Sequence, residues 1–144
     1  MKSTTLILIA TCAVLTAVAG LQVVRAQAPS LAAGVYTEEQ AKRGMGLYKE
    51  QCAACHGEDL KGNEVIPALT GDPFVTSWQG KTLGDLFEKI SMTMPALNPG
   101  SLSPEQTADL IAQILSASKY PAGKTALPST MDALAQIKID APKR

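Results

Sequence analysis

The stretch QCAACHGEDL, residues 51–60, brings two cysteines and the only histidine of the chain into five positions: Cys52, Cys55 and His56. The preceding segment, TEEQAKRGMGLYKEQC, opens with Thr37 and Gln40 at the spacing of a capping box, which satisfies the free amides at a helix start. Ala41, Met45 or Gly44, Tyr48 and Cys52 then recur at helical spacing. The pattern predicts a helix over about 38–52, with the cysteine–histidine motif at its end.

Several kinds of site use these residue types. A thioredoxin-like dithiol places Cys-x-x-Cys at a turn from a strand into a helix, and no alternation of strands and helices surrounds this motif. A structural zinc site needs about four ligands, and Cys52, Cys55 and His56 supply three. The remaining cysteine, Cys12, lies in an N-terminal apolar run. A disulfide between Cys52 and Cys55 is geometrically poor and leaves His56 unexplained.

The pattern Cys-x-x-Cys-His is the direct signal for covalent attachment of haem c. Two thiols add across the two vinyl groups on one edge of the porphyrin, and residues three apart lie on one side of a helical turn. His56, four residues after Cys52, can then bind the iron. Since the chain has no second histidine, the sixth iron ligand is expected to be a methionine. The candidates are Met45, Met92, Met94 and Met131.

The N-terminus resembles an export signal. Lys2 precedes the apolar run LILIATCAVLTAVAGLQVV, residues 6–24, and Ala26-Gln27-Ala28 offers small residues at the spacing that a signal peptidase reads. Residues 1–28 are therefore predicted to be a signal peptide cleaved after Ala28 or Ala26, and the protein is expected in the periplasm. The alternative is an uncleaved anchor, because the run approaches membrane-spanning length. Cys12 follows Thr11 inside the run, which is not the context of a lipoprotein cysteine.

Charge and aromatic content narrow the class of protein. The chain has 13 basic and 13 acidic residues, and loss of Lys2 and Arg25 with the leader leaves 11 against 13, a formal net charge of −2. A net negative charge does not favour binding to nucleic acid or to an anionic membrane surface, so neither is an expected partner. Cleavage leaves 116 residues with only six aromatic side chains, so a bound group is expected to help fill the core.

The other elements follow from caps and breakers. Glycines and prolines from Gly57 to Gly80 predict a long loop with at most a turn of helix. A helix is predicted over 82–91, with Thr82 as its cap and Asp85 at the third helical position, and another over about 103–118, with Ser103 as cap, Pro104 at the first position and Gln106 three after the cap. A short helix is predicted near 130–137, whose Met131, Leu134 and Ile137 dock on the body. The predicted fold class is all-α, with three main helices and long loops. The expected divisions are the signal peptide (1–28), a flexible lead-in (29–36), one helical domain (37–120) and a C-terminal extension (121–144).

A family resemblance rests on motifs spread over most of the chain. They are GLYKEQCAACHG, IPALTGDPF, a downstream Trp, TMPALNPGSLS, a helix ending in tyrosine-proline, and PAGKTALP. Together they resemble a small bacterial class I cytochrome c with one haem, similar to those found as carriers or subunits beside quinohaemoprotein dehydrogenases. The likeness runs from about Tyr36 to Ile139.

The resemblance implies roles for single residues. The family's methionine ligand stands in a Met-Pro pair, here Met94-Pro95, which favours Met94 over Met92. A proline carbonyl, here that of Pro67, accepts the N–H of the haem histidine. A tryptophan such as Trp78 hydrogen-bonds a haem propionate, with simple packing as the alternative role.

The resemblance also bears on the contact between the terminal helices of the domain. Gly44 and Tyr48 match the glycine-x-x-x-aromatic pattern of a helix that crosses the C-terminal helix closely. Gln113 stands where relatives often have an aromatic residue. Because of this departure, the resemblance does not predict how the side chains pack at that position.

The implied function is single-electron transfer through a low-spin haem with histidine and methionine ligands, without catalysis. The expected partners are redox proteins: a donor dehydrogenase, and an acceptor oxidase or another cytochrome. The membrane is a partner only if the N-terminal segment is retained. One alternative is an electron-relay subunit of a periplasmic dehydrogenase. A further alternative is a haem gas sensor or peroxidase with a labile Met94.

Overall fold

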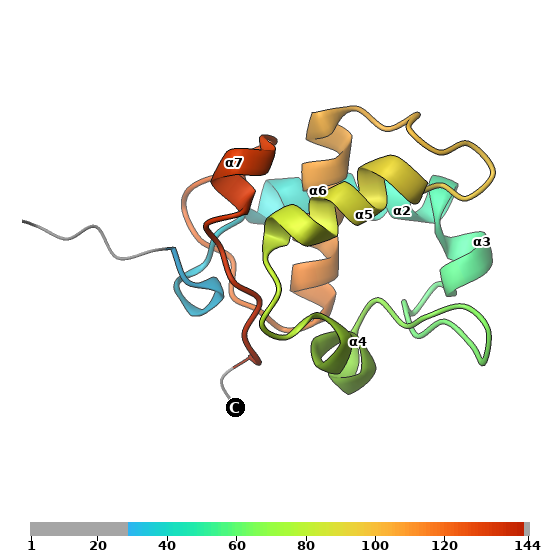
Figure 1. The fold of residues 1–144 in the computed structure, drawn as a ribbon, viewed down its shortest axis with the longest axis horizontal. Helices are drawn as coiled ribbons and strands as arrows, with labels where there is room; N and C mark the ends of the chain where they lie inside the picture. The colour runs from blue at the N-terminus through green and yellow to red at the C-terminus, as the bar shows by residue number, and fades with distance from the viewer. Residues whose placement is uncertain (1–28, 143–144) are drawn as a thin grey trace, which may run out of the picture.

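Helices make up the regular structure of residues 29–142, the part of the chain that the structure, a computed structural model, describes (Figure 1). This part holds no strand, only an isolated antiparallel bridge between Thr82 and Lys138, so the all-α prediction is confirmed. None of its helices is long and apolar enough to cross a membrane. The predicted leader lies outside the described residues. The elements are η1 (Leu31–Ala33), α2 (Glu38–Gln51), α3 (Ala53–His56), α4 (Gly71–Trp78), α5 (Leu83–Thr93), α6 (Pro104–Ala117) and α7 (Met131–Leu134).

The contact between α2 and α6 organises the fold. The two helices cross at Gly44, where a Cβ atom would lie 1.9 Å from the backbone oxygen of Asp109 and 3.0 Å from Cβ of Gln113. Only glycine permits so close an approach, which confirms the sequence interpretation of Gly44 as a crossing point. Beside it, Nε and Nη2 of Arg43 each donate to a carboxylate oxygen of Asp109 at 2.7 Å. Gln113, the residue that replaces an aromatic, is buried at this crossing.

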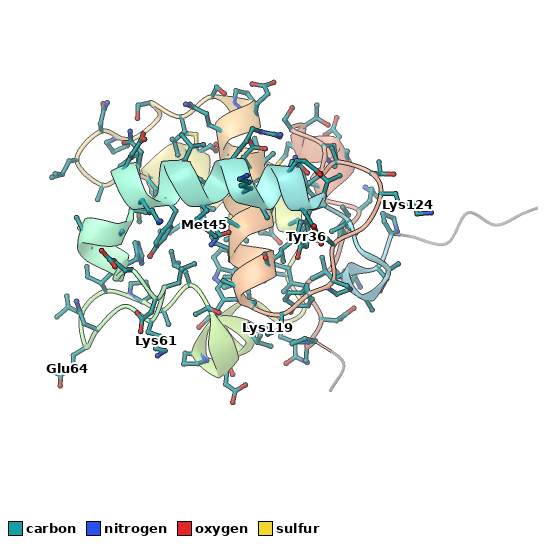
Figure 2. All side chains as sticks on the ribbon, turned by 180° about the vertical axis from the view of Figure 1, so that it is seen from behind. Tyr36, Met45, Lys61, Glu64, Lys119 and Lys124 are labelled. Carbon is teal, nitrogen blue, oxygen red and sulfur yellow. The ribbon has the colours of Figure 1, made fainter. Side chains whose placement is uncertain are left out.

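Helix α6 runs through the centre of the molecule. It starts with a capping box between Ser103 and Gln106 and has Pro104 in the first turn, as predicted. Every residue over 107–115 is buried, because α2 lies on one side of α6 and α5 on the other (Figures 1 and 2). A helix buried all round thus forms the wall against which the other elements pack.

Helix α5 begins at a capping box between Thr82 and Asp85, also as predicted. Its apolar face buries Leu86 and Ile90, and its C-terminal cap is Met94. This helix therefore delivers the Met94-Pro95 pair to the edge of the core.

The segment from 57 to 80 is less irregular than predicted, because α4 fills two turns of it. Gly71 and Pro73, which indicated a loop, both lie in the first turn of α4, where backbone N–H groups need no partner within the helix. Phe74 follows in α4 and is fully buried, which secures the helix to the core.

The lead-in and the C-terminal extension pack on each other. Leu31 and Tyr36 are buried, Tyr36 Oη donates to the carbonyl of Tyr120 at 2.6 Å, and the N–H of Gly123 donates to the carbonyl of Tyr36 at 2.7 Å. Residues 29–36 thus differ from the flexible lead-in that the sequence predicted, because their two apolar side chains find a place in the core.

The tail helix is shorter than predicted. It covers Met131–Leu134 only, after which residues 137–139 run beside 80–83, with Leu83 N–H to Ile137 O and Ile139 N–H to Lys81 O both at 2.8 Å. Leu134 and Ile137 are buried, but Met131 is 39% exposed. Docking of Met131 was therefore a wrong prediction: it starts the helix, on the side that faces solvent.

Candidate haem site

The Cys-x-x-Cys-His motif forms a single helical turn after α2. Cys52 leaves helical geometry with φ −127°, and its carbonyl accepts hydrogen bonds from the N–H groups of Cys55 and His56 at 3.1 and 2.9 Å. Gly57 then ends α3 at φ +80°, a left-handed conformation that side-chain-bearing residues rarely adopt. The break at Cys52 turns α3 away from the axis of α2, so that Cys52, Cys55 and His56 line one pocket.

His56 is buried and held in a fixed orientation. The side chain is 7% exposed, and its Nδ1 lies 2.9 Å from the carbonyl oxygen of Pro67. A carbonyl can only accept, so Nδ1 carries the proton and Nε2 keeps a lone pair. This tautomer is the one that a metal ligand requires, since the remaining nitrogen is available to iron.

The loop after α3 places the Pro67 carbonyl. Gly62 has φ +62°, its N–H donates to the carbonyl of His56 at 2.8 Å, and a Cβ atom there would lie 2.2 Å from the Ile66 carbonyl oxygen. Asn63 closes the turn, because its Oδ1 accepts the N–H groups of Val65 and Ile66, both at 2.9 Å. The loop therefore returns to the histidine through contacts that only a glycine at 62 allows.

An apolar pocket of about 210 Å³ lies between these elements. Residues from α2, α3, the following loop, the end of α4, α5, the loop after α5 and α6 all contribute to its walls. They include Tyr48, Cys52, Cys55, His56, Pro67, Leu69, Trp78, Leu86, Ile90, Met94, Leu110 and Ile114. The pocket is thus built where the long loops face the central helix.

The methionines divide clearly with respect to this pocket. Met94 is partly buried and lines it, beside the same cavity as His56. Met92 is 67% exposed and lines a separate surface hollow instead. Met45 and Met131 are exposed and line neither. Of the four methionines in the described residues, Met94 alone lines the pocket that His56 also lines.

Trp78, the last residue of α4, lies at the edge of the pocket. Its ring centroid is 6.3 Å from that of Phe74, and Nζ of Lys81 lies 4.7 Å from its centroid. A partly buried indole can present its N–H to a ligand while its ring packs on neighbours. The structure therefore accommodates both roles that the sequence left open for Trp78.

The donor set and the cavity fit haem c. Cys52 and Cys55 are free thiols, and burial, together with the neighbouring Cys55, raises the pKa of the Cys52 thiol. An unattached Cys52 is therefore a neutral thiol at neutral pH. Two thiols, an oriented imidazole and a thioether surround an apolar space, which is the chemistry that a covalently bound, six-coordinate haem requires. Residues 29–142 hold no cluster of three or more His, Cys, Asp or Glu side chains that would bind a metal ion directly.

The sequence interpretation did not identify several walls of the pocket. Leu86 and Ile90 in α5 and Leu110 and Ile114 in α6 line it as pairs four residues apart. That spacing puts each pair on one helical face, so periodicity was a usable signal. The same periodicity also describes an ordinary core, and nothing in the sequence separates the two uses.

Comparisons with known proteins indicate the family of the chain. Residues 39–114 match the family model described as "Cytochrome C oxidase, cbb3-type, subunit III". The fold is similar to a chain in the crystal structure of the sulfane dehydrogenase SoxCD from Paracoccus pantotrophus, with a TM-score of 0.51 and 22% sequence identity. That likeness covers 69% of this chain and 52% of the other, so the chain spans about half the length of its structural relative. No curated protein matches the chain.

The family match extends over more than half of the chain, from the first turn of α2 to the last turn of α6, and takes in the attachment motif, Pro67, Trp78 and Met94. The protein therefore belongs to this family of cytochrome c domains, and it is a small class I cytochrome c that carries one covalently bound haem c.

Proposed function

We propose that this haem c protein carries single electrons between redox proteins, with His56 and Met94 as the two protein ligands of the iron. One observation carries the proposal: His56 and Met94 line the same apolar pocket as both thiols, whereas the other three described methionines lie outside it. If His56 and Met94 both bound the iron, no coordination site would be left for a substrate. We therefore propose a carrier rather than a catalyst.

The chain's own residues set the conditions for transfer. The Pro67 carbonyl fixes the His56 ring, and the backbone N–H of Met94 is held by the carbonyl of Ile90 at 2.9 Å. Ligands held by the fold move little when the iron changes its charge, which keeps reorganisation small. Bound haem supplies an iron that alternates between ferric and ferrous states. A thioether ligand and an apolar pocket both favour the ferrous state, so the residues raise the reduction potential.

Alanine substitution of Met94 and, separately, of Met92 tests the ligand assignment. Oxidised wild-type protein is expected to show the weak far-red charge-transfer band of an iron–methionine bond. Met94→Ala should lose this band and lower the reduction potential. Met92→Ala is the matched control, because Met92 is only two residues away but lies outside the pocket, and it should keep both properties. Loss of the band in Met92→Ala with its retention in Met94→Ala would show that the wrong methionine was chosen.

A second candidate is an electron-relay subunit of a larger periplasmic dehydrogenase. The name of the matched family describes a subunit, and the structural relative is a dehydrogenase that contains a chain of similar fold. Purification from the native host distinguishes the two candidates: a relay subunit stays with a large catalytic subunit, and a free carrier elutes alone. Carbon monoxide binding to reduced protein at neutral pH would instead favour a gas sensor or peroxidase with a labile Met94.

We also propose that the protein is exported to the periplasm, which is supported by the signal-like residues 1–28 and by the need of haem c for assembly outside the cytoplasm. N-terminal sequencing of the mature protein tests this. Cleavage after Ala28 predicts a chain that starts at Pro29, whereas a start at Met1 or Lys2 identifies a retained anchor.

A further inference from the structure

Lys89 has an unusual place in the haem pocket. The described side chains that line this pocket include no arginine, aspartate or glutamate, and Lys89 is the only lysine among them. It lies on α5 between the pocket-facing positions Leu86 and Ile90 and the exposed face of the helix. Lys89 is exposed, so its ammonium group stands at the mouth of an otherwise apolar cavity, where it can pair with an anionic group of a bound ligand.

A second hollow, on the surface, adjoins the pocket at this point. Trp78 and Lys89 line both spaces, and the charged residues that the hollow adds are Lys81, Asp85 and Glu88. The Asp85 carboxylate is occupied, since its Oδ2 accepts from the N–H of Thr82 at 2.7 Å and from its hydroxyl at 2.9 Å. The ion pairs within residues 29–142 are Arg43–Asp109 and Lys61–Asp59, so no carboxylate of this part of the chain pairs with Lys89.

Haem c brings two anionic groups of its own. Its two propionates project from the porphyrin edge opposite the two thioether bonds. Since Cys52 and Cys55 fix one edge at α3, the propionates must leave the pocket on another side, and Lys89 with Trp78 offers a cation and an N–H donor at its mouth. We propose that Lys89 is a positioning residue that pairs with a haem propionate at the junction of the pocket and the hollow. This inference rests on the binding of haem by His56 and Met94 proposed above.

Such a pairing has two consequences for the bound cofactor. A cation beside a carboxylate favours its ionised form and therefore lowers the pKa of the propionate. The same positive charge disfavours further positive charge on the iron, so it favours the ferrous state. The pairing therefore lowers the pH at which the reduction potential begins to respond to propionate ionisation.

The test is the pH dependence of the reduction potential of the purified holoprotein, measured by spectroelectrochemistry. Lys89→Gln should move the bend of the potential–pH curve to higher pH, and Lys89→Arg should keep it near the wild-type position. Lys81→Gln is the matched control, because Lys81 lies in the hollow but does not line the pocket. The acidic residues of the hollow, Asp85 and Glu88, are unchanged in all variants, so their effect on the potential is common to every curve.

A larger upward shift in Lys89→Gln than in Lys81→Gln, restored in Lys89→Arg, supports the pairing. A shift in Lys89→Gln that is no larger than that of Lys81→Gln overturns it. The far-red charge-transfer band, recorded on the same samples, separates this outcome from a failure of the ligand assignment. If the band persists while the bend does not move, only the role of Lys89 falls.

Discussion

At the scale of single residues, Tyr48 connects the attachment helix to the haem site. Its hydroxyl donates to the carbonyl of Gly57 at 2.5 Å, where α3 ends, and its ring lines the pocket. The side chain is 2% exposed, and burial raises the pKa of Tyr48 to about 12. The neutral phenol is therefore the form that the folded protein holds.

This shift predicts a loss of stability in alkali. The unfolded tyrosine ionises at a pKa of about 10, so its contribution is complete below about pH 10 and is lost as the pH rises through about 12. Between about pH 9 and about pH 11.5, denaturant unfolding should show a smaller loss of unfolding free energy in Tyr48→Phe than in wild type. Tyr36 and Tyr120, whose pKa values burial also raises, remain in both proteins. Equal losses in the two proteins would contradict the prediction.

At the scale of elements, the crossing of α2 and α6 depends on one missing side chain. Gly44 and Gly46 lie on the same helix, but a Cβ atom at Gly44 meets the backbone of Asp109, and one at Gly46 meets nothing within 4 Å. The same helix ends at Gln51, and Cys52, directly after it, begins the attachment turn. A change in this contact therefore reaches the haem site through the helix itself.

Two alanine variants separate these positions. Gly44→Ala should lower the unfolding free energy by about 1–3 kcal/mol or more, because the helices must move apart to admit a methyl group. Gly46→Ala should raise it by about 0.4–1 kcal/mol, since alanine is the better helix former at an open position. Denaturant unfolding of both variants measures the difference, and equal effects would mean that the crossing adapts without cost.

The elements also show which features a sequence makes visible. The caps at Thr37, Thr82 and Ser103 were predicted from residue types three positions apart. At Thr37 only half of the predicted capping box forms: Oγ1 of Thr37 accepts the N–H of Gln40, but the Gln40 side chain bonds to Leu127 instead of to the cap. Helix α4 was taken for loop, since Gly71 and Pro73 break helices everywhere except in the first turn, and only the burial of Phe74 shows that they lie there.

Some residues of the site could also be identified from the sequence, and others could not. The attachment motif and Met94-Pro95 are local signals, so Cys52, Cys55 and His56 could be interpreted directly and Met94 by resemblance. The position of Lys89 at the pocket mouth depends on how α5 rotates against α6 and on where α4 ends. No spacing along the chain encodes that arrangement, because it arises from the packing of separate elements.

At the scale of the whole molecule, hydrogen bonds from Gln40 connect the C-terminal extension to the start of α2. Nε2 of Gln40 donates to the Leu127 carbonyl at 3.0 Å, and Oε1 of Gln40 accepts the Leu127 N–H at 2.6 Å. Both partners are buried, so one amide side chain satisfies both backbone groups of a residue 87 positions away. The extension is thereby part of the folded domain rather than an appendage.

Removal of this side chain should therefore destabilise the whole protein. Gln40→Ala leaves the N–H and carbonyl of Leu127 buried without partners, at a cost of about 1–3 kcal/mol in unfolding free energy. Gln136→Ala is the matched control, because Gln136 is exposed, and its effect should stay within about 0.5 kcal/mol. Thermal and denaturant unfolding measure both, with faster hydrogen exchange at the Leu127 amide expected only in Gln40→Ala. An unchanged exchange rate at the Leu127 amide in Gln40→Ala would show that the Gln40–Leu127 hydrogen bonds do not hold the extension in place.

The positions of the two ends of the molecule also determine how it would be oriented by a tether. Figure 2 shows Lys124 at one end of the molecule and Lys61 and Glu64, from the loop after the haem motif, toward the other. A tether joined ahead of residue 29, whether a retained anchor, a fused domain or a chemical link to an electrode, would hold the protein by the end away from α3 (Figure 1). The loop after α3, which carries Pro67, would then lie at the end of the molecule away from the tether (Figure 1).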